Sequence, residues 1–349
     1  MWINYRVAPF SAIFMVATAS AQPDTYNTDV VYQRCLMEEL AIASPETTVA
    51  DIKALCEPSR TLTDHADANA DTNADADTEE ITPFEKRMAV ETQTRDELFV
   101  ITPHHPNYLL PASYDFNGNN LPHNSNKVKL DNTEVQFQIS LKAPFVEGLF
   151  HENGDIYVAY TNRSWWQAYN KNISSPFRET NHEPEIFYNL TTDYNLLGVK
   201  VRNLQLGLSH QSNGRSNELS RSWNRVYASV LLERHNFYVN IRPWLRLKED
   251  KKKHPGDANG DDNPDISRYM GDGELTIFYK FHNEHSLNMM LRNNLRSDNR
   301  GAVQIGWTFP LTNRLRGYVQ YFNGYGDSLI DYNESSNRLS LGFMLTDWL

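Results

Sequence analysis

Long apolar runs, cysteines and clusters of basic residues are all scarce in this chain of 349 residues. No stretch of about 18 apolar residues follows the N-terminal segment, which argues against a helical membrane protein. A β-barrel is still compatible, because its strands alternate apolar and polar residues. Cys35 and Cys56 are the only cysteines, which argues against a thiol enzyme or a Cys-rich metal site. Lys and Arg form no concentrated patch, so we expect no nucleic-acid partner.

The N-terminal residues have the pattern of a secretory signal peptide. Arg6 precedes an apolar stretch and then a run of small residues suited to cleavage, so we predict a signal peptide at 1–21. Export would place Cys35 and Cys56 in an oxidising compartment. One disulfide between them is then the economical expectation.

Two further segments precede the main domain. Residues 22–60 have helical spacing and predict a small accessory unit of two helices linked by that disulfide. Residues 61–96 begin with low-complexity Asp, Ala, Asn and Thr, and predict an acidic disordered linker. Much of the net charge of −11 lies here, because 64–80 contains seven acidic residues and no Lys or Arg. The acidity is therefore local.

From about residue 97 to the C-terminus, apolar and polar residues alternate. In 237–248, for example, Phe237, Val239 and Ile241 alternate with polar neighbours. A soluble β-sandwich and a membrane barrel both produce this pattern. Export, Arg and Lys on the polar face, and Tyr and Trp near the strand ends favour the barrel. We therefore predict an all-β domain at 97–349, a twelve-stranded antiparallel transmembrane β-barrel.

The strand count is even, as expected when both termini lie in the periplasm. Short and long connections mostly alternate along the chain, and the long ones are expected to be extracellular. The predicted strands are 97–111, 133–145, 155–167, 183–196, 200–213, 222–234, 237–248, 268–281, 285–296, 302–310, 315–323 and 337–348.

Three polar residues continue the apolar faces of two neighbouring strands. The apolar stripe of the strand 200–213 ends at Leu208, and His210 and Ser212 follow it by twos. Asn224 holds the matching position on the next strand. A nucleophile, a base and an orienting amide in this order suit serine hydrolysis. Periodicity alone leaves a second explanation equally open, namely polar residues where the apolar band ends.

Four longer stretches resemble the outer membrane phospholipase A family. They are SHQSNGRSNELSRSWNR at 209–225, SSPFRETNHEP at 174–184, DDNPDISRYMG at 261–271 and GYGDSLIDYN at 324–333. The resemblance covers roughly 97–349. It implies Ser212 as the nucleophile, His210 as the base and Asn224 as the orienting amide.

The resemblance also implies Ca²⁺ as cofactor and a homodimer as the active form. The implied ligands are the Arg215 carbonyl, the Ser220 hydroxyl and the partner subunit's Ser174, with a further position at Asp262. Without the resemblance, the Asp-rich stretch around Asp262 would be interpreted as a solvated loop. The family has a Gln at one position of the dimer interface, and this sequence has Asn162 there. The strength of the dimer is therefore left open.

The implied activity is calcium-dependent hydrolysis of the sn-1 and sn-2 acyl esters of phospholipids and lysophospholipids in the bacterial outer membrane, activated by dimerisation. A lysine-rich stretch at 249–260 and the final pair Trp348-Leu349 depart from the family pattern. Alternatives from other classes are a passive channel, an outer-membrane protease and a lipid A deacylase.

Overall fold

The computed structural model describes residues 81–94, 102–119, 129–149, 154–254, 257, 260–312 and 315–347. The predicted signal peptide, the accessory segment 22–60 with its cysteines, and the acidic stretch as far as residue 80 lie outside these residues. Within them, no helix is long and apolar enough to cross a membrane.

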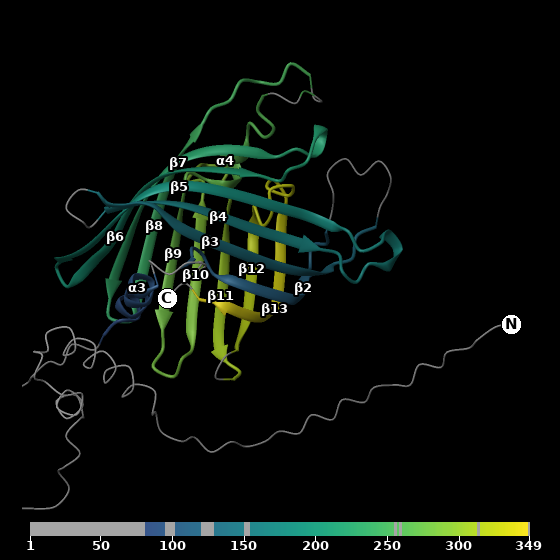
Figure 1. Ribbon diagram of the computed structural model, residues 1–349. Helices are drawn as coiled ribbons and strands as arrows, with labels where there is room; N and C mark the ends of the chain where they lie inside the picture. Colours follow the sequence, from purple (N-terminus) through teal and green to yellow (C-terminus); the bar gives the residue numbers. More distant parts are fainter. Residues whose placement is uncertain are drawn as a thin grey trace, which may run out of the picture. The chain divides into compact units, whose positions relative to one another are not determined.

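Twelve antiparallel strands close into one barrel (Figure 1). Each strand pairs with the next along the chain, and the last pairs with the first to complete the ring, as predicted. The barrel strands are β2 (Asn107–Asp115), β3 (Thr133–Leu149), β4 (Gly154–Trp166), β5 (Phe177–Leu196), β6 (Val199–Ser212), β7 (Ser222–Arg234), β8 (Phe237–Leu247), β9 (Gly273–Lys280), β10 (Ser286–Asn293), β11 (Gly301–Pro310), β12 (Arg316–Tyr325) and β13 (Ser335–Thr346).

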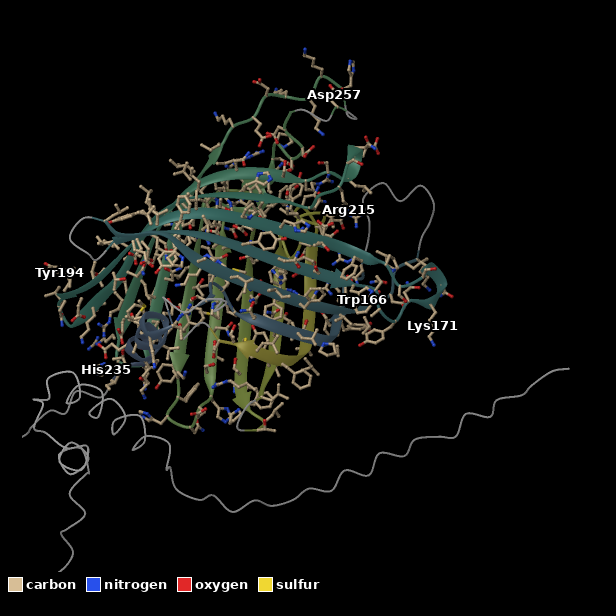
Figure 2. All side chains as sticks on the ribbon, in the orientation of Figure 1. Trp166, Lys171, Tyr194, Arg215, His235 and Asp257 are labelled. Carbon is tan, nitrogen blue, oxygen red and sulfur yellow. The ribbon has the colours of Figure 1, made fainter. Side chains whose placement is uncertain are left out.

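Connections at the two ends of the barrel differ in length, as the sequence predicted. One end carries the longer loops, and Figure 2 shows Arg215 and Asp257 there. The opposite end carries tight turns, including those beside Tyr194 and His235. The chain thus enters and leaves the barrel at the end with the tight turns, and the site predicted from the sequence falls at the other.

The two faces of each strand have opposite chemistry. On β6, Leu204, Leu206 and Leu208 are exposed on the outside, whereas Arg202 and Ser209 are buried inside. A sandwich would bury the apolar face, but a barrel presents it to lipid. The closed ring therefore resolves the ambiguity left by periodicity in favour of the membrane barrel.

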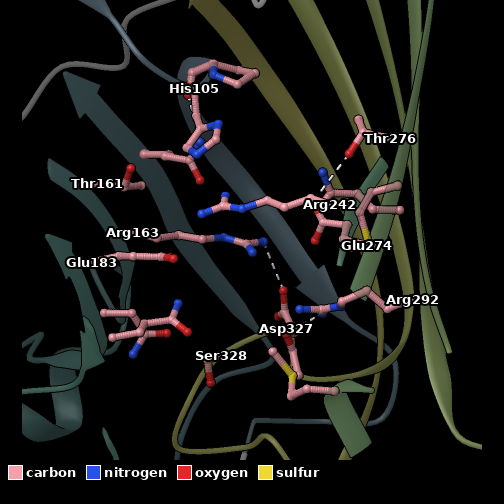
Figure 3. Close-up of a pocket in the computed structure, with 18 of the residues that line it drawn as sticks. His105, Thr161, Arg163, Glu183, Arg242, Glu274, Thr276, Arg292, Asp327 and Ser328 are labelled. Atoms are coloured by element: carbon pink, nitrogen blue, oxygen red, sulfur yellow. Dashed lines mark hydrogen bonds and ion pairs between the residues drawn. The ribbon is translucent and has the colours of Figure 1, made fainter. Parts of the chain in front are cut away.

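Ion pairs cross the interior of the barrel. The Arg338 guanidinium contacts Glu134 at 2.9 Å, Asp327 at 2.8 Å and Asp115 at 3.1 Å. Arg178 shares Glu134 at 2.9 Å. Buried charges persist only when they are paired in this way. One cavity among the described residues has a volume of about 230 Å³, and Figure 3 shows charged side chains reaching into it. Side chains thus fill much of the described interior, where a passive channel would need open space.

The prediction of a disordered linker at 61–96 is wrong for its described part, residues 81–94. A helix, α3 (Pro83–Gln93), lies there. Thr82 caps it, Pro83 occupies the first turn, and Glu85 completes the capping box. Phe84 anchors the helix in a buried cluster of side chains from β7, β8 and β9, namely Leu231, Tyr238 and Phe278.

Two predicted strands differ from expectation within the described residues. The strand expected at 97–111 is divided into β1 (Thr102–Pro103) and β2, because Pro103 and Pro106 cannot donate ladder hydrogen bonds. The strand expected at 268–281 begins with a short helix, α4 (Ile266–Met270), and only then continues as β9. Gly271, at a φ of 72°, ends α4.

Candidate active site

The polar residues predicted from the strand pattern meet at the loop-rich end of β6 and β7. His210 of β6 lies directly opposite Asn224 of β7 in the antiparallel register. His210 is exposed on the outer face, while Ser212 and Asn224 are partly exposed. The structure thus places all three at the rim of the lipid-facing surface, in line with the apolar stripe that ends at Leu208.

The His210 ring is held by the Asn224 side chain. Its Nδ1 lies 2.7 Å from the Asn224 Oδ1. An amide oxygen can only accept, so the Nδ1 must carry the proton and donate it. The Nε2 is then left with a free lone pair, which is the state that a general base requires.

A carboxylate lies on the far side of the amide. The Asn224 Nδ2 donates to the Glu249 Oε1 at 2.8 Å. Because a carboxylate only accepts, it holds the amide nitrogen toward itself and the amide oxygen toward His210. Glu249 follows β8, at the start of the lysine-rich stretch 249–260 that departs from the family pattern. Sequence reasoning missed it, since a single Glu in a Lys-rich stretch carries no periodic signal.

Ser212 lies between two histidines. His210 precedes it by two residues on β6, and His182 is its register partner on β5. The His182 Nδ1 is engaged by the Tyr160 hydroxyl at 2.6 Å and lies 3.4 Å from the Asn162 amide. The hydrogen bonds of the described residues do not include one between Ser212 and either ring. Catalytic contacts of this kind are often long in the absence of substrate.

The loop after Ser212 is folded around one buried amide. The Asn213 Oδ1 accepts from the Arg221 backbone N–H at 2.9 Å and from that of Arg215 at 3.3 Å. Its Nδ2 donates to the Leu219 carbonyl at 2.9 Å. The Asn-Gly pair at 213–214 is a turn signal that points to this residue. Asn213 therefore fixes the backbone that follows the Ser212 position.

Hard oxygen donors gather beside this loop. The Ser220 hydroxyl donates to the Asp262 carboxylate at 2.7 Å, and the Ser222 hydroxyl reaches the same oxygen at 3.2 Å. The Lys252 ammonium contacts the other Asp262 oxygen. Serine and carboxylate oxygens are the ligand types that Ca²⁺ takes. The donors thus fit the ion, and Lys252 competes for the same carboxylate.

Two other residues implied as ligands lie in separate loops. Arg215 is anchored by its side chain to β5, where it contacts Glu179 at 3.2 Å and the Arg178 carbonyl. Ser174 ends the 3-10 turn Lys171–Ile173 with a φ of 58°. Among the described residues, Ser174 makes no hydrogen bond with Ser220 or Asp262, whose side chains contact each other.

The fold and the site together define a class, namely a membrane β-barrel with a cluster of Ser, His and Asn side chains on its outer face. Residues 84–345 match the Phospholipase A1 family. The phospholipase A1 of Klebsiella pneumoniae is 38% identical over 256 residues, which is 73% of this chain and 85% of that protein. The chain therefore belongs to this family and is an outer membrane phospholipase.

Solved structures agree with this membership. The calcium-bound dimer of the Salmonella typhi outer membrane phospholipase is similar at 36% identity and a TM-score of 0.64, over 72% of this chain and 94% of that one. Outer membrane phospholipase A from Escherichia coli is similar at 36% identity and a TM-score of 0.65, over 72% of this chain and 100% of that one.

Proposed function

We propose that the chain hydrolyses the sn-1 and sn-2 acyl esters of phospholipids and lysophospholipids, with Ser212 as nucleophile, His210 as base and Asn224 as orienting amide. The observation that carries this proposal is the 2.7 Å contact between the His210 Nδ1 and the Asn224 Oδ1 on the lipid-facing side of the barrel. That contact leaves the Nε2 available on the strand that also carries Ser212.

The reaction runs in two half-steps. The Ser212 Oγ attacks the ester carbonyl while the His210 Nε2 takes its proton, and the same proton then passes to the departing glycerol oxygen. Water attacks the acyl-serine by the reverse route and releases the fatty acid. The Ser212 backbone N–H is the natural donor to the developing oxyanion, an interaction worth about 10²–10³ in rate in comparable sites.

The position of the site accounts for substrate access. Leu204, Leu206 and Leu208 form an exposed apolar stripe that leads along β6 to His210. An acyl chain can lie along this stripe while its ester reaches Ser212, so that the lipid does not have to leave the membrane. This arrangement supports a lipid ester as the substrate.

Ca²⁺ is the cofactor that the oxygen donors support. Ser220, Asp262 and the Arg215 carbonyl would hold the ion, together with the partner subunit's Ser174. The bound ion would supply positive charge near the oxyanion. A site completed only by a second subunit would restrict activity to the homodimer, which is consistent with the dimeric, calcium-bound relative. The signal peptide at 1–21 would provide export to the outer membrane.

Fatty-acid release from mixed phospholipid–detergent micelles tests the proposal, with Ca²⁺ or chelator present. The wild type should release fatty acid only with Ca²⁺, and Ser212→Ala should reduce the rate to background. Ser209→Ala is the matched control, because Ser209 lies on the same strand with its side chain inside the barrel. Calcium-dependent release that persists in Ser212→Ala would rule out Ser212 as the nucleophile.

A further inference from the structure

A second cluster of titratable side chains lies inside the barrel and has no part in the proposed hydrolysis. His104 and His105 lie between β1 and β2, and Glu185 lies on β5. One ligand atom from each of the three falls within 4.8 Å of the other two. His104 and Glu185 are both more than nine-tenths buried. The two histidines are adjacent in sequence, and Glu185 comes from a distant segment of the chain.

Two atoms of this cluster have unsatisfied hydrogen-bonding capacity. The His104 Nε2 lies 3.5 Å from the Glu185 Oε1, and the His105 Nε2 lies 3.8 Å from the same oxygen. Both separations are too long for a normal hydrogen bond. The His104 Nε2 and the Glu185 Oε1 are buried with no hydrogen-bond partner. Leaving such groups unpaired costs stability unless something binds between them.

The separations suit a tetrahedral metal ion. Zinc bonds of 2.0–2.1 Å to nitrogen and oxygen place neighbouring ligand atoms about 3.3 Å apart. The observed 3.5 and 3.8 Å are close to that spacing. Two imidazoles and one carboxylate are a common zinc set with an open fourth position. The cavity beside His105 provides room for a water there (Figure 3).

The backbone and neighbouring rings hold the ligands in place. The backbone N–H of His104 donates to the Ser140 carbonyl at 3.2 Å, and that of His105 donates to the Ser140 Oγ at 3.0 Å. The His104 ring stacks on Phe187 with centroids 5.1 Å apart. Little reorganisation would therefore be needed for an ion to bind.

Cations near the cluster are already paired. Arg242 donates to the other Glu185 oxygen, Oε2, at 2.6 Å, and Lys142 contacts Glu91 at 2.8 Å. Oε1 is thus the Glu185 atom that faces the histidines. The Arg242 charge still opposes a bound cation and competes for the Glu185 carboxylate.

We propose that His104, His105 and Glu185 form a transition-metal site in the barrel lumen that takes Zn²⁺. The site is separate from the oxygen-rich cluster at Asp262, since imidazole nitrogen suits zinc and Ca²⁺ prefers oxygen. A bound ion would fasten the β1–β2 segment to β5 across the lumen. It would stabilise the folded barrel through binding linkage.

Isothermal titration of the full chain in detergent tests this site. The protein is first stripped with chelator, then titrated with Zn²⁺ in excess Ca²⁺, so that oxygen-ligand sites are occupied. One equivalent of Zn²⁺ should bind. His104→Ala and Glu185→Gln each remove a direct ligand. Each should therefore weaken Zn²⁺ binding by more than the ~10–100-fold that is typical when a residue hydrogen-bonded to a ligand is lost. His282→Ala is the control, because His282 is exposed in the β9–β10 turn.

A variant that is expected to bind Zn²⁺ more tightly distinguishes loss of a ligand from loss of the fold. Arg242→Gln removes the competing cation and should tighten Zn²⁺ binding. Far-UV circular dichroism verifies that each variant keeps its strands. The absence of Zn²⁺ binding to the folded wild type, or equal binding by wild type and His104→Ala, would overturn the proposal. Neither result bears on hydrolysis at Ser212.

Discussion

The Asn224 side chain donates from its Nδ2 to the Glu249 carboxylate at 2.8 Å. The opposite edge of the same amide accepts from His210. Because the Glu249 carboxylate can only accept, the Asn224 amide must turn its nitrogen toward Glu249 and its oxygen toward His210. That orientation sets the tautomer of the His210 imidazole. Glu249 therefore acts on the proposed base through Asn224.

Replacing Glu249 with Ala should lower kcat with little change in KM. Without the carboxylate the amide is free to rotate, and a rotated amide presents an N–H to His210. The expected loss is about tenfold, the equivalent of one net hydrogen bond of ~1.4 kcal/mol. The same variant should also change the pH profile of kcat. Asp250→Asn is the neighbouring control, and an unchanged kcat and pH profile in Glu249→Ala would contradict this role.

His182→Ala should retain most of the activity, whereas His210→Ala should lose at least ~10³-fold. The two rings flank Ser212. Only the His210 ring contacts an atom that can only accept a hydrogen bond, the Asn224 Oδ1. The Tyr160 hydroxyl beside His182 can either donate or accept, and so it does not set that ring's tautomer. Steady-state hydrolysis by the two variants decides between them. Equal losses would mean that both rings are needed.

Lys252→Ala should lower the Ca²⁺ concentration needed for half-maximal hydrolysis. The Lys252 ammonium occupies an oxygen of Asp262, the carboxylate proposed to bind the ion. Removing a competing cation strengthens binding of the remaining one. Asp262→Ala should shift the requirement in the opposite direction. Lys253→Ala, which alters the adjacent exposed lysine, is the control, and a Ca²⁺ requirement raised by Lys252→Ala would count against the proposed site.

The attachment of α3 should weaken in acid. Burial alone would raise the pKa of the Glu91 carboxyl, but Lys142 and Arg87 hold it below its ordinary value of 4.5. A carboxylate with a lowered pKa stabilises the fold above its unfolded pKa, and the contribution is lost as pH falls through the folded pKa. Backbone hydrogen exchange in Pro83–Gln93, corrected for intrinsic rates, should show reduced protection below about pH 4.

Glu91→Gln provides the control for that measurement. The variant lacks the carboxylate, so it should show weaker protection of α3 near neutral pH and little further loss in acid. An acid response in Glu91→Gln equal to that of the wild type would assign the effect to another group.

The sequence was sufficient to predict the barrel because alternation along a strand has a direct physical cause. Every second side chain faces lipid, and the strand 222–234 was predicted with the bounds that the structure gives β7. The same alternation placed His210 and Asn224 on one face, and antiparallel pairing then set them opposite each other. These relations depend on local periodicity and on chain order alone.

Other contacts could not be predicted from periodicity, because they depend on irregular loops and on segments that are distant in sequence. Glu249 reaches Asn224 from an irregular stretch with no period. His104 meets Glu185 only after the barrel closes. The helix α3 is a different case, since Thr82, Pro83 and Glu85 form a capping signal that the surrounding acidic composition obscured.

The central claim is that Ser212 is the nucleophile, and covalent labelling tests it most directly. A fluorophosphonate with a long alkyl chain, added to the full chain in micelles with Ca²⁺, should modify one serine that peptide mass spectrometry locates. The label is expected on Ser212 in the wild type, with little or none in His210→Ala, because the unactivated hydroxyl reacts slowly. A label on any other residue, or equal labelling of Ser212 when His210 is absent, would contradict it.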